Sequence, residues 1–125
     1  LEENMQFWFL IAGAALSLAG MMFHGFAGQK KVMENVYKSD MASLTKSLSL
    51  VSWHIYTIFL LVSGITLIYV AYYPDFYLAT YPIIGVNLLG AALFIFLGLG
   101  THKVLLKMPG VYLMSGTALL AWLGI

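Results

Sequence analysis

The 125-residue chain contains no cysteine and no arginine. The lack of cysteine excludes disulfides, thiolate metal ligands and cysteine nucleophiles. The lack of arginine removes the planar guanidinium group that binds phosphate or carboxylate through two hydrogen bonds. A net charge of +1 adds no electrostatic attraction to nucleic acid. We therefore expect no nucleic-acid partner.

Charged residues are also scarce, at 9% of the chain, whereas hydrophobic residues make up 62%. A soluble domain has roughly 25% charged residues, so this composition predicts an integral membrane protein whose main partner is the lipid bilayer. Paired carboxylates, a nucleophile triad, a phosphate-binding glycine loop and a dinucleotide motif are all missing from the sequence. We expect no catalysis by side chains alone; an enzyme would need a bound metal or cofactor.

Four apolar stretches predict an all-α bundle of four transmembrane helices, which forms one domain over residues 1–125. The stretches cover residues 6–27, 47–72, 81–101 and 109–125, and the last is near the lower length limit for crossing a bilayer. Gly28 and the polar residues after it predict the end of the first span. Residues 30–46 carry apolar side chains at helical spacing, which predicts an amphipathic helix in the membrane interface.

The distribution of lysines predicts the orientation of the chain. If the four spans alternate in direction, one membrane face receives all six lysines and the opposite face receives Glu2, Glu3 and Asp75. Lysines in short loops are retained on the cytoplasmic side. We therefore expect both termini outside the cytoplasm and two basic loops inside it. The lysines are Lys30, Lys31, Lys38, Lys46, Lys103 and Lys107.

The same alternation places His24, His54 and His102 near the lysine-rich face, with depths that agree within roughly 10 Å at about 1.5 Å per residue. His24 belongs to a stripe of small residues at spacings of three and four, and such a stripe lets a neighbouring helix pack closely. His54 shares a helical face with Thr57, Leu61 and Gly64. Both histidines are therefore expected to face the bundle interior. The stripe consists of Gly13, Ser17, Gly20, His24 and Gly28.

Several roles of these histidines are compatible with the sequence. Neutral His24 and His54 can simply hydrogen-bond between helices. They can also ligate a b-type haem between the first two spans, or join His102 in a zinc or copper site. A proton relay or pH sensor is a further alternative. Asn87, the single amide of the third span, is expected to hydrogen-bond to a neighbouring helix.

The segment from His24 to Gly64 resembles a loosely defined group of small bacterial membrane proteins that have not been characterised. The matching residues are His24 near the end of the first span, Gly28 four residues later, and the pair Trp53 and His54 that opens the second. The chain departs from the group by having Gln29 where an acid is common, and by lacking arginine. The resemblance implies four spans and a bacterial inner membrane, and it implies no activity.

Two functions remain open from the sequence. The first is a small membrane protein that binds a metal ion or haem through His24 and His54. The second is a non-catalytic accessory or structural subunit that packs against other membrane subunits, or against copies of itself, through its small-residue stripe and its apolar surface.

Overall fold

The computed structural model describes residues 2–125, and within this range the chain forms helices joined by short turns. The first predicted span begins as α1 (Glu3–Met22) and the second corresponds to α3 (Ser43–Tyr72). The third and fourth correspond to α4 (Thr80–Leu99) and α5 (Pro109–Leu123). The all-α prediction is confirmed. The remaining elements are the π-helix η1 (Phe23–Gly28), α2 (Gln29–Lys38) and the 3₁₀ helices η2 (Pro74–Ala79) and η3 (Lys103–Lys107).

The prediction that Gly28 ends the first helix is wrong. Backbone angles stay right-handed helical from Met22 through Gly28 to Gln29, so α1, η1 and α2 form one continuous helix of 36 residues. A glycine that ends a helix commonly has a positive φ, whereas Gly28 keeps the helical values of φ −65° and ψ −43°. The predicted amphipathic helix over residues 30–46 is therefore divided: α2 ends at Lys38, and the last residues belong to α3.

The other helix ends follow local backbone chemistry. α3 ends at Tyr72, as expected, because Tyr73 has the extended φ of −130° and precedes Pro74. Met108 is extended as well (ψ 144°) and precedes Pro109, which occupies the first turn of α5 where its missing N–H costs nothing.

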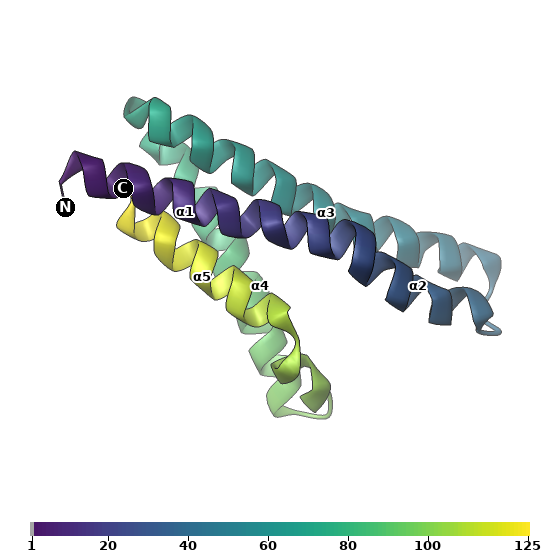
Figure 1. The fold of residues 1–125 in the computed structure, drawn as a ribbon. Helices are drawn as coiled ribbons and strands as arrows, with labels where there is room; N and C mark the ends of the chain where they lie inside the picture. Colours follow the sequence, from purple (N-terminus) through teal and green to yellow (C-terminus); the bar gives the residue numbers. More distant parts are fainter. Residues whose placement is uncertain (1) are drawn as a thin grey trace.

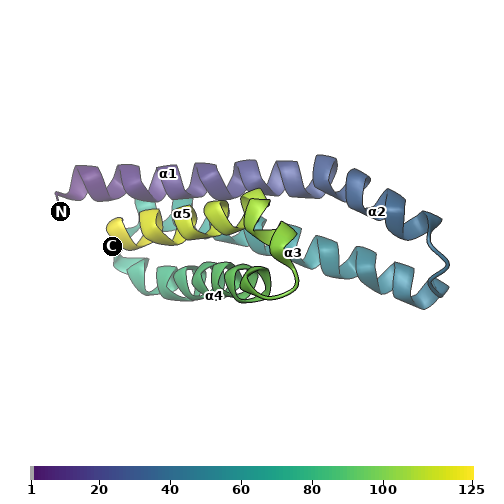
Figure 2. The ribbon, with the colours of Figure 1, turned by 90° about the horizontal axis from the view of Figure 1, so that it is seen from below.

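The helices form two antiparallel pairs that share one end. The α1–η1–α2 helix runs beside α3, and α4 runs beside α5 (Figure 1). α5 also packs along α1, whereas α3 has little contact with α4. Both chain ends lie at the shared end, and the two pairs diverge away from it (Figures 1 and 2). The molecule is therefore a fork whose two arms end at the α2–α3 turn and at η3.

The apolar core lies at the shared end, where all four long helices meet. Its buried members come from α1, α3, α4 and α5: Leu10, Ala14, Leu67, Val70, Ile83, Ile84, Ala118 and Ala121. A smaller buried group of Ala91, Val111 and Met114 joins α4 to α5.

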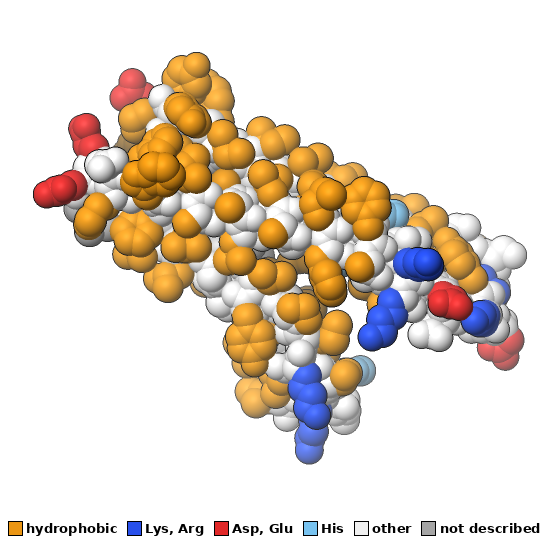
Figure 3. Space-filling view, in the orientation of Figure 1, with side chains coloured by type: hydrophobic (Ala, Val, Ile, Leu, Met, Phe, Trp, Pro, Cys, Tyr) orange, Lys and Arg blue, Asp and Glu red, His pale blue; other side chains and the backbone are white. Residues whose placement is uncertain are grey.

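Most of the apolar surface lies outside this core. In the most apolar 18-residue stretch of each long helix, few residues are buried: 28% in Glu3–Lys38, 28% in Ser43–Tyr72 and 22% in Pro74–Leu99. Hydrophobic side chains cover the middle of the molecule between two charged ends (Figure 3). Monomeric soluble proteins rarely expose contiguous apolar patches larger than a few hundred Å². The helices therefore need another apolar phase or partner to cover them.

Three helical stretches, Glu3–Lys38, Ser43–Tyr72 and Pro74–Leu99, are long and apolar enough to cross a membrane. α5 is apolar but has only 15 residues, a length of about 22 Å at 1.5 Å per residue. The predicted number of four apolar helices is thus confirmed. Three of them have the length needed to span a bilayer, and α5 is shorter.

Candidate functional site

The small-residue stripe of the first helix packs against neighbouring helices, as the sequence predicts, and these are α3 and α5. The Ser17 hydroxyl is buried and donates a hydrogen bond of 2.8 Å to the carbonyl of Leu60. A Cβ built on Gly13 would lie 3.2 Å from Leu67 of α3. Small side chains allow this close approach of two helices. The stripe therefore holds His24 against α3.

The ring of His24 is fixed by Thr57. His24 Nδ1 lies 2.9 Å from Thr57 Oγ1, and this hydroxyl is also 3.4 Å from the carbonyl oxygen of Trp53. A hydroxyl has one proton, so when Thr57 donates it to the Trp53 carbonyl, it accepts the proton of His24 Nδ1. This arrangement assigns the Nδ1–H tautomer and leaves the lone pair on Nε2. Within residues 2–125, Nε2 has no hydrogen-bond partner.

Trp53 makes a second contact with the same residue. Its indole ring stacks on the imidazole of His24, with ring centres 4.1 Å apart and an interplanar angle of 7°. Its Nε1–H also donates a hydrogen bond of 2.8 Å to the backbone carbonyl of His24, which accepts the N–H of Gln29 as well. Tyr56 approaches the imidazole edge-on at 4.9 Å. His24 is thus held by three residues of α3.

Two glycines of η1 make room for this packing. A Cβ on Gly25 would lie 2.9 Å from the Thr57 methyl group, and one on Gly28 would lie 3.0 Å from the Trp53 ring. These distances are shorter than ordinary carbon contacts of about 3.5 Å or more. Gly28 is therefore required for close approach to the indole, and it does not end the helix.

The three predicted histidines lie in different surroundings. His24 and His54 are half-buried, on the first helix and on α3, whereas His102 is exposed beside η3 on the other arm. No group of three or more His, Asp or Glu side chains that could hold a metal ion occurs between residues 2 and 125. These positions give no support to the predicted zinc or copper site formed by His24, His54 and His102.

The hydrogen bond between His24 and Thr57 agrees with the prediction that His24 bonds between helices, but the sequence did not predict the contact with Trp53. The face of α3 toward α1 contains Trp53, Thr57 and Leu60, the last only 5% exposed, whereas the predicted Leu61 is 38% exposed. Trp53, Thr57 and Gly64 follow one another at spacings of four and seven residues, so they share one face of α3. That spacing is the signal that could have found it.

The prediction for Asn87 is also wrong. Its side-chain amide is buried, and Nδ2 donates a hydrogen bond of 2.8 Å to the carbonyl of Ile83 in the same helix. Asparagine competes well for backbone carbonyls within its own helical turn. The amide therefore needs no partner on a neighbouring helix.

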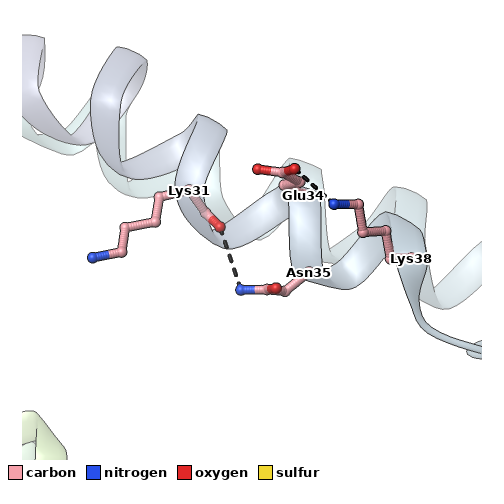
Figure 4. Close-up of polar contacts among 4 residues, drawn as sticks. All are labelled: Lys31, Glu34, Asn35 and Lys38. Carbon is pink, nitrogen blue, oxygen red and sulfur yellow. Dashed lines mark hydrogen bonds and ion pairs between the residues drawn. The ribbon is translucent and has the colours of Figure 1, made fainter.

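Two side-chain contacts of α2, those of Lys38 and Asn35, are made within that helix (Figure 4). Lys38 Nζ lies 2.8 Å from Glu34 Oε1, and both side chains are more than half exposed. Asn35 donates to the carbonyl of Lys31. An exposed pair four residues apart contributes about 0.3–0.5 kcal/mol. Glu34 thus balances a lysine and is not engaged with His24.

Two overlapping hollows lie at the end of the molecule opposite to His24. One of about 310 Å³ lies where the first turns of α1 meet the end of α3 and the end of the chain. Its lining is mainly apolar and holds no histidine or acid: Gln6, Leu10, Val70, Pro74, Tyr77, Gly124 and Ile125. This hollow offers no ligand set for a metal ion.

No protein-family model matches the chain, and comparisons with curated proteins and with solved structures also find no match. The fold by itself defines an α-helical bundle with three helices capable of spanning a membrane.

Proposed function

We propose that the chain is a small, non-catalytic accessory or structural subunit embedded in a membrane by four spans. Its large exposed apolar surface, in a band between two charged ends, supports the placement in lipid (Figure 3). α5 would cross by local thinning of the bilayer, which costs only fractions of a kcal/mol per Å of mismatch.

The proposed orientation has the lysine end in the cytoplasm. Lys30, Lys31 and Lys38 belong to the first helix at the α2 end, and Lys46 lies in the first turn of α3. Lys103 and Lys107 bound η3 at the tip of the other arm. The positive-inside tendency places these lysines in the cytoplasm and both termini outside. The resemblance of the His24 to Gly64 segment to small bacterial proteins favours a bacterial inner membrane.

The observation that carries the accessory role is that one ring nitrogen, one ring face and the backbone carbonyl of His24 are all engaged within the α1–α3 pair. Its Nδ1 is bound to Thr57, its ring lies on Trp53, and its carbonyl accepts the Trp53 indole N–H. A polar imidazole ring inside a membrane is costly unless it has hydrogen-bond partners and packs against protein, as it does here. In this role the histidine joins two helices and does no chemistry.

The test compares His24→Asn with His24→Ala in detergent-purified protein. Asparagine Nδ2 can take the place of histidine Nδ1 and donate to Thr57, so we expect His24→Asn to retain most of the thermal stability that His24→Ala loses. We also expect substoichiometric metal and no Soret band in the parent protein. A Soret band, or stoichiometric zinc or copper, that disappears in His24→Ala would refute the accessory role.

A second candidate function is favoured by one observation, the lone pair left on His24 Nε2. Metal-bound histidines usually hold their other ring nitrogen in a hydrogen bond, as Thr57 holds Nδ1 here. In this alternative His24 and His54 ligate a haem iron or a zinc or copper ion. His54→Ala separates the two functions, because it would abolish the Soret band or metal content and leave the His24 contacts intact.

A further inference from the structure

A continuous row of apolar residues runs along the whole outer face of α3. Its members alternate at spacings of four and three, which is the heptad pattern of a coiled-coil seam. Every one is between 46% and 70% exposed. We call this row the α3 seam; it consists of Leu44, Leu48, Val51, Ile55, Ile58, Val62, Ile65, Tyr69 and Tyr72.

The α3 seam faces away from the rest of the molecule. At about 100° per residue, Val62 lies about 160° around α3 from Gly64, which packs against Leu18 of α1, and Ile65 lies about 100° from it on the same outer side. The buried face, with Leu60, Leu67 and Val70, belongs to the α1 side. From Leu44 to Ile65 no other element within residues 2–125 covers the seam. At its end, Phe76 of η2 and Phe7 of α1 contact the rings of Tyr69 and Tyr72 edge-on.

The first part of the seam distinguishes it from an ordinary lipid-facing surface. Between Ser43 and Ser52 the apolar residues are Leu50 and three seam members, and the others are serines, a threonine and a lysine. Lys46 turns away and donates to the carbonyl of Tyr37. In this part of α3 the apolar residues therefore form only a narrow stripe along the helix. Its width is that of a contact between two helices, as in a coiled coil.

This part of α3 also extends beyond the hydrocarbon layer. The helix has 30 residues, about 45 Å of length, whereas the hydrocarbon core is roughly 30 Å thick. If Tyr72 marks the outer boundary, the turns before Trp53 leave the hydrocarbon on the lysine side. Leu44, Leu48 and Val51 then present exposed apolar surface to the interface and to water.

We propose that the α3 seam is the contact surface for a second copy of this chain, in a parallel dimer with α3 beside α3. The parallel direction rests on the proposed membrane placement, because two copies inserted in one membrane share an orientation. In a parallel pair, each seam residue meets the same residue of the partner about a two-fold axis, as a self-complementary interface requires. Leucine and β-branched residues meet like residues at every level below the tyrosines.

The charges beside the seam and the exposed area of the seam are both compatible with a second copy of the chain as the partner. The positions that flank the first two heptads of the seam hold Thr45, Ser47, Ser52 and His54, so no lysine or acid meets its own copy across the axis. With about half of each side chain exposed, the nine seam residues offer on the order of 900 Å² per chain, near the roughly 800 Å² per partner of a standard stable interface.

Disulfide crosslinking in membranes tests the dimer directly, because the chain has no cysteine of its own. We expect Leu48→Cys and Val51→Cys to form covalent dimers under mild oxidation. Leu89→Cys on α4, at a residue that is 74% exposed, is the matched control and should stay monomeric, as should Ser43→Cys beside the seam. Equal crosslinking at Leu89 or Ser43, or none at the seam, would overturn the proposal.

The same variants report the direction of the pair. A parallel dimer crosslinks at Leu48, at its midpoint Ile58 and at Ile65, whereas an antiparallel dimer crosslinks only near Ile58. Crosslinking confined to Ile58→Cys would therefore also contradict the proposal. Labelling of the loops from outside the membrane reports the membrane placement independently, so failure of that placement and failure of the dimer are distinguishable.

A second measurement uses noncovalent mass in detergent. We expect two copies per particle for the parent chain, and one copy for the double variant Leu48→Ser and Val51→Ser. Both residues are exposed within one chain, so helix content and the α1–α3 packing should be retained. The control is Leu89→Ser with Leu93→Ser on α4. A parent chain that is monomeric, or a serine variant that remains dimeric, would count against the seam.

Discussion

At the scale of single residues, the half-buried site is a hydrogen-bonded and stacked group in which His24 is central. Thr57 accepts from Nδ1, Trp53 covers one face of the ring, and Tyr56 meets its edge. Each contact joins the first helix to α3. The residues of this group can therefore be tested one at a time through the stability of the helix pair.

Removal of the Thr57 hydroxyl is the first test. Thr57→Val keeps the shape of the side chain but leaves His24 Nδ1–H without its acceptor, so we expect a loss of about 0.6–2 kcal/mol, the range for interhelical hydrogen bonds in membranes. The measurement is thermal or denaturant unfolding in detergent. Thr66→Val, at a half-buried position of the same helix with no side-chain hydrogen bond within residues 2–125, is the control. Equal losses in the two variants would show that the hydroxyl of Thr57 has no special role.

The indole N–H of Trp53 is tested by Trp53→Phe. Phenylalanine keeps an aromatic ring to stack on His24 but cannot donate to its carbonyl, which retains the N–H of Gln29. We expect a loss of about 0.5–1.5 kcal/mol, the net value of one hydrogen bond. Trp8→Phe, at a residue 60% exposed, should change the unfolding free energy much less. No difference between the two variants would argue against the bond.

At the scale of helices, the contact between α1 and α3 depends on glycine at the crossing. A Cβ on Gly64 would lie 2.5 Å from Leu18 Cγ and 3.4 Å from the carbonyl oxygen of Ala14. The close approach also lets Ser17 reach the carbonyl of Leu60. Without it the helices would separate, and the His24 contacts would lengthen.

We therefore expect Gly64→Ala to destabilise the fold by about 1–3 kcal/mol, the usual cost of added volume in a packed contact. Gly85→Ala is the matched control, because nothing lies within 4 Å of the Cβ it would add. Alanine is the better helix former by about 1 kcal/mol, so this control should be neutral or stabilising. Circular dichroism during thermal unfolding measures both. A Gly64→Ala protein as stable as the control would contradict the close packing.

At the scale of the whole molecule, the charged ends predict how the chain lies in a membrane. Residues of η2 and both termini lie at the shared end of the fork, and the two arms carry the lysines (Figures 1 and 3). The membrane orientation follows from this polarity and from the retention of lysines on the cytoplasmic side.

Single cysteines in the two kinds of loop test that orientation. We expect Phe76→Cys in η2 to react with a membrane-impermeant maleimide added to intact cells. Thr101→Cys, beside η3, should react only after the membrane is opened. Both positions are exposed in the fold, so accessibility within the protein does not decide the result. The reverse pattern would invert the proposed topology, and labelling of both residues in intact cells would rule out alternating spans.

The sequence by itself determined the helical class, the approximate positions of the long helices and the separation of charge along the molecule. It also determined that His24 faces another helix. These features depend on composition, on the period of 3.6 residues per turn and on prolines, all of which act within a segment. Helix ends that depend on proline, such as those at Tyr72 and Pro109, were therefore predictable.

Only the tertiary structure decided which residues meet. Gly28 has the sequence context of a helix end, but the indole of Trp53 occupies the space beside it, and the helix continues. Trp53 meets His24, while His102 lies on a separate arm, because the two helix pairs diverge toward the lysine end. Contacts between helices depend on their rotation and crossing, which a periodic pattern along one segment leaves free.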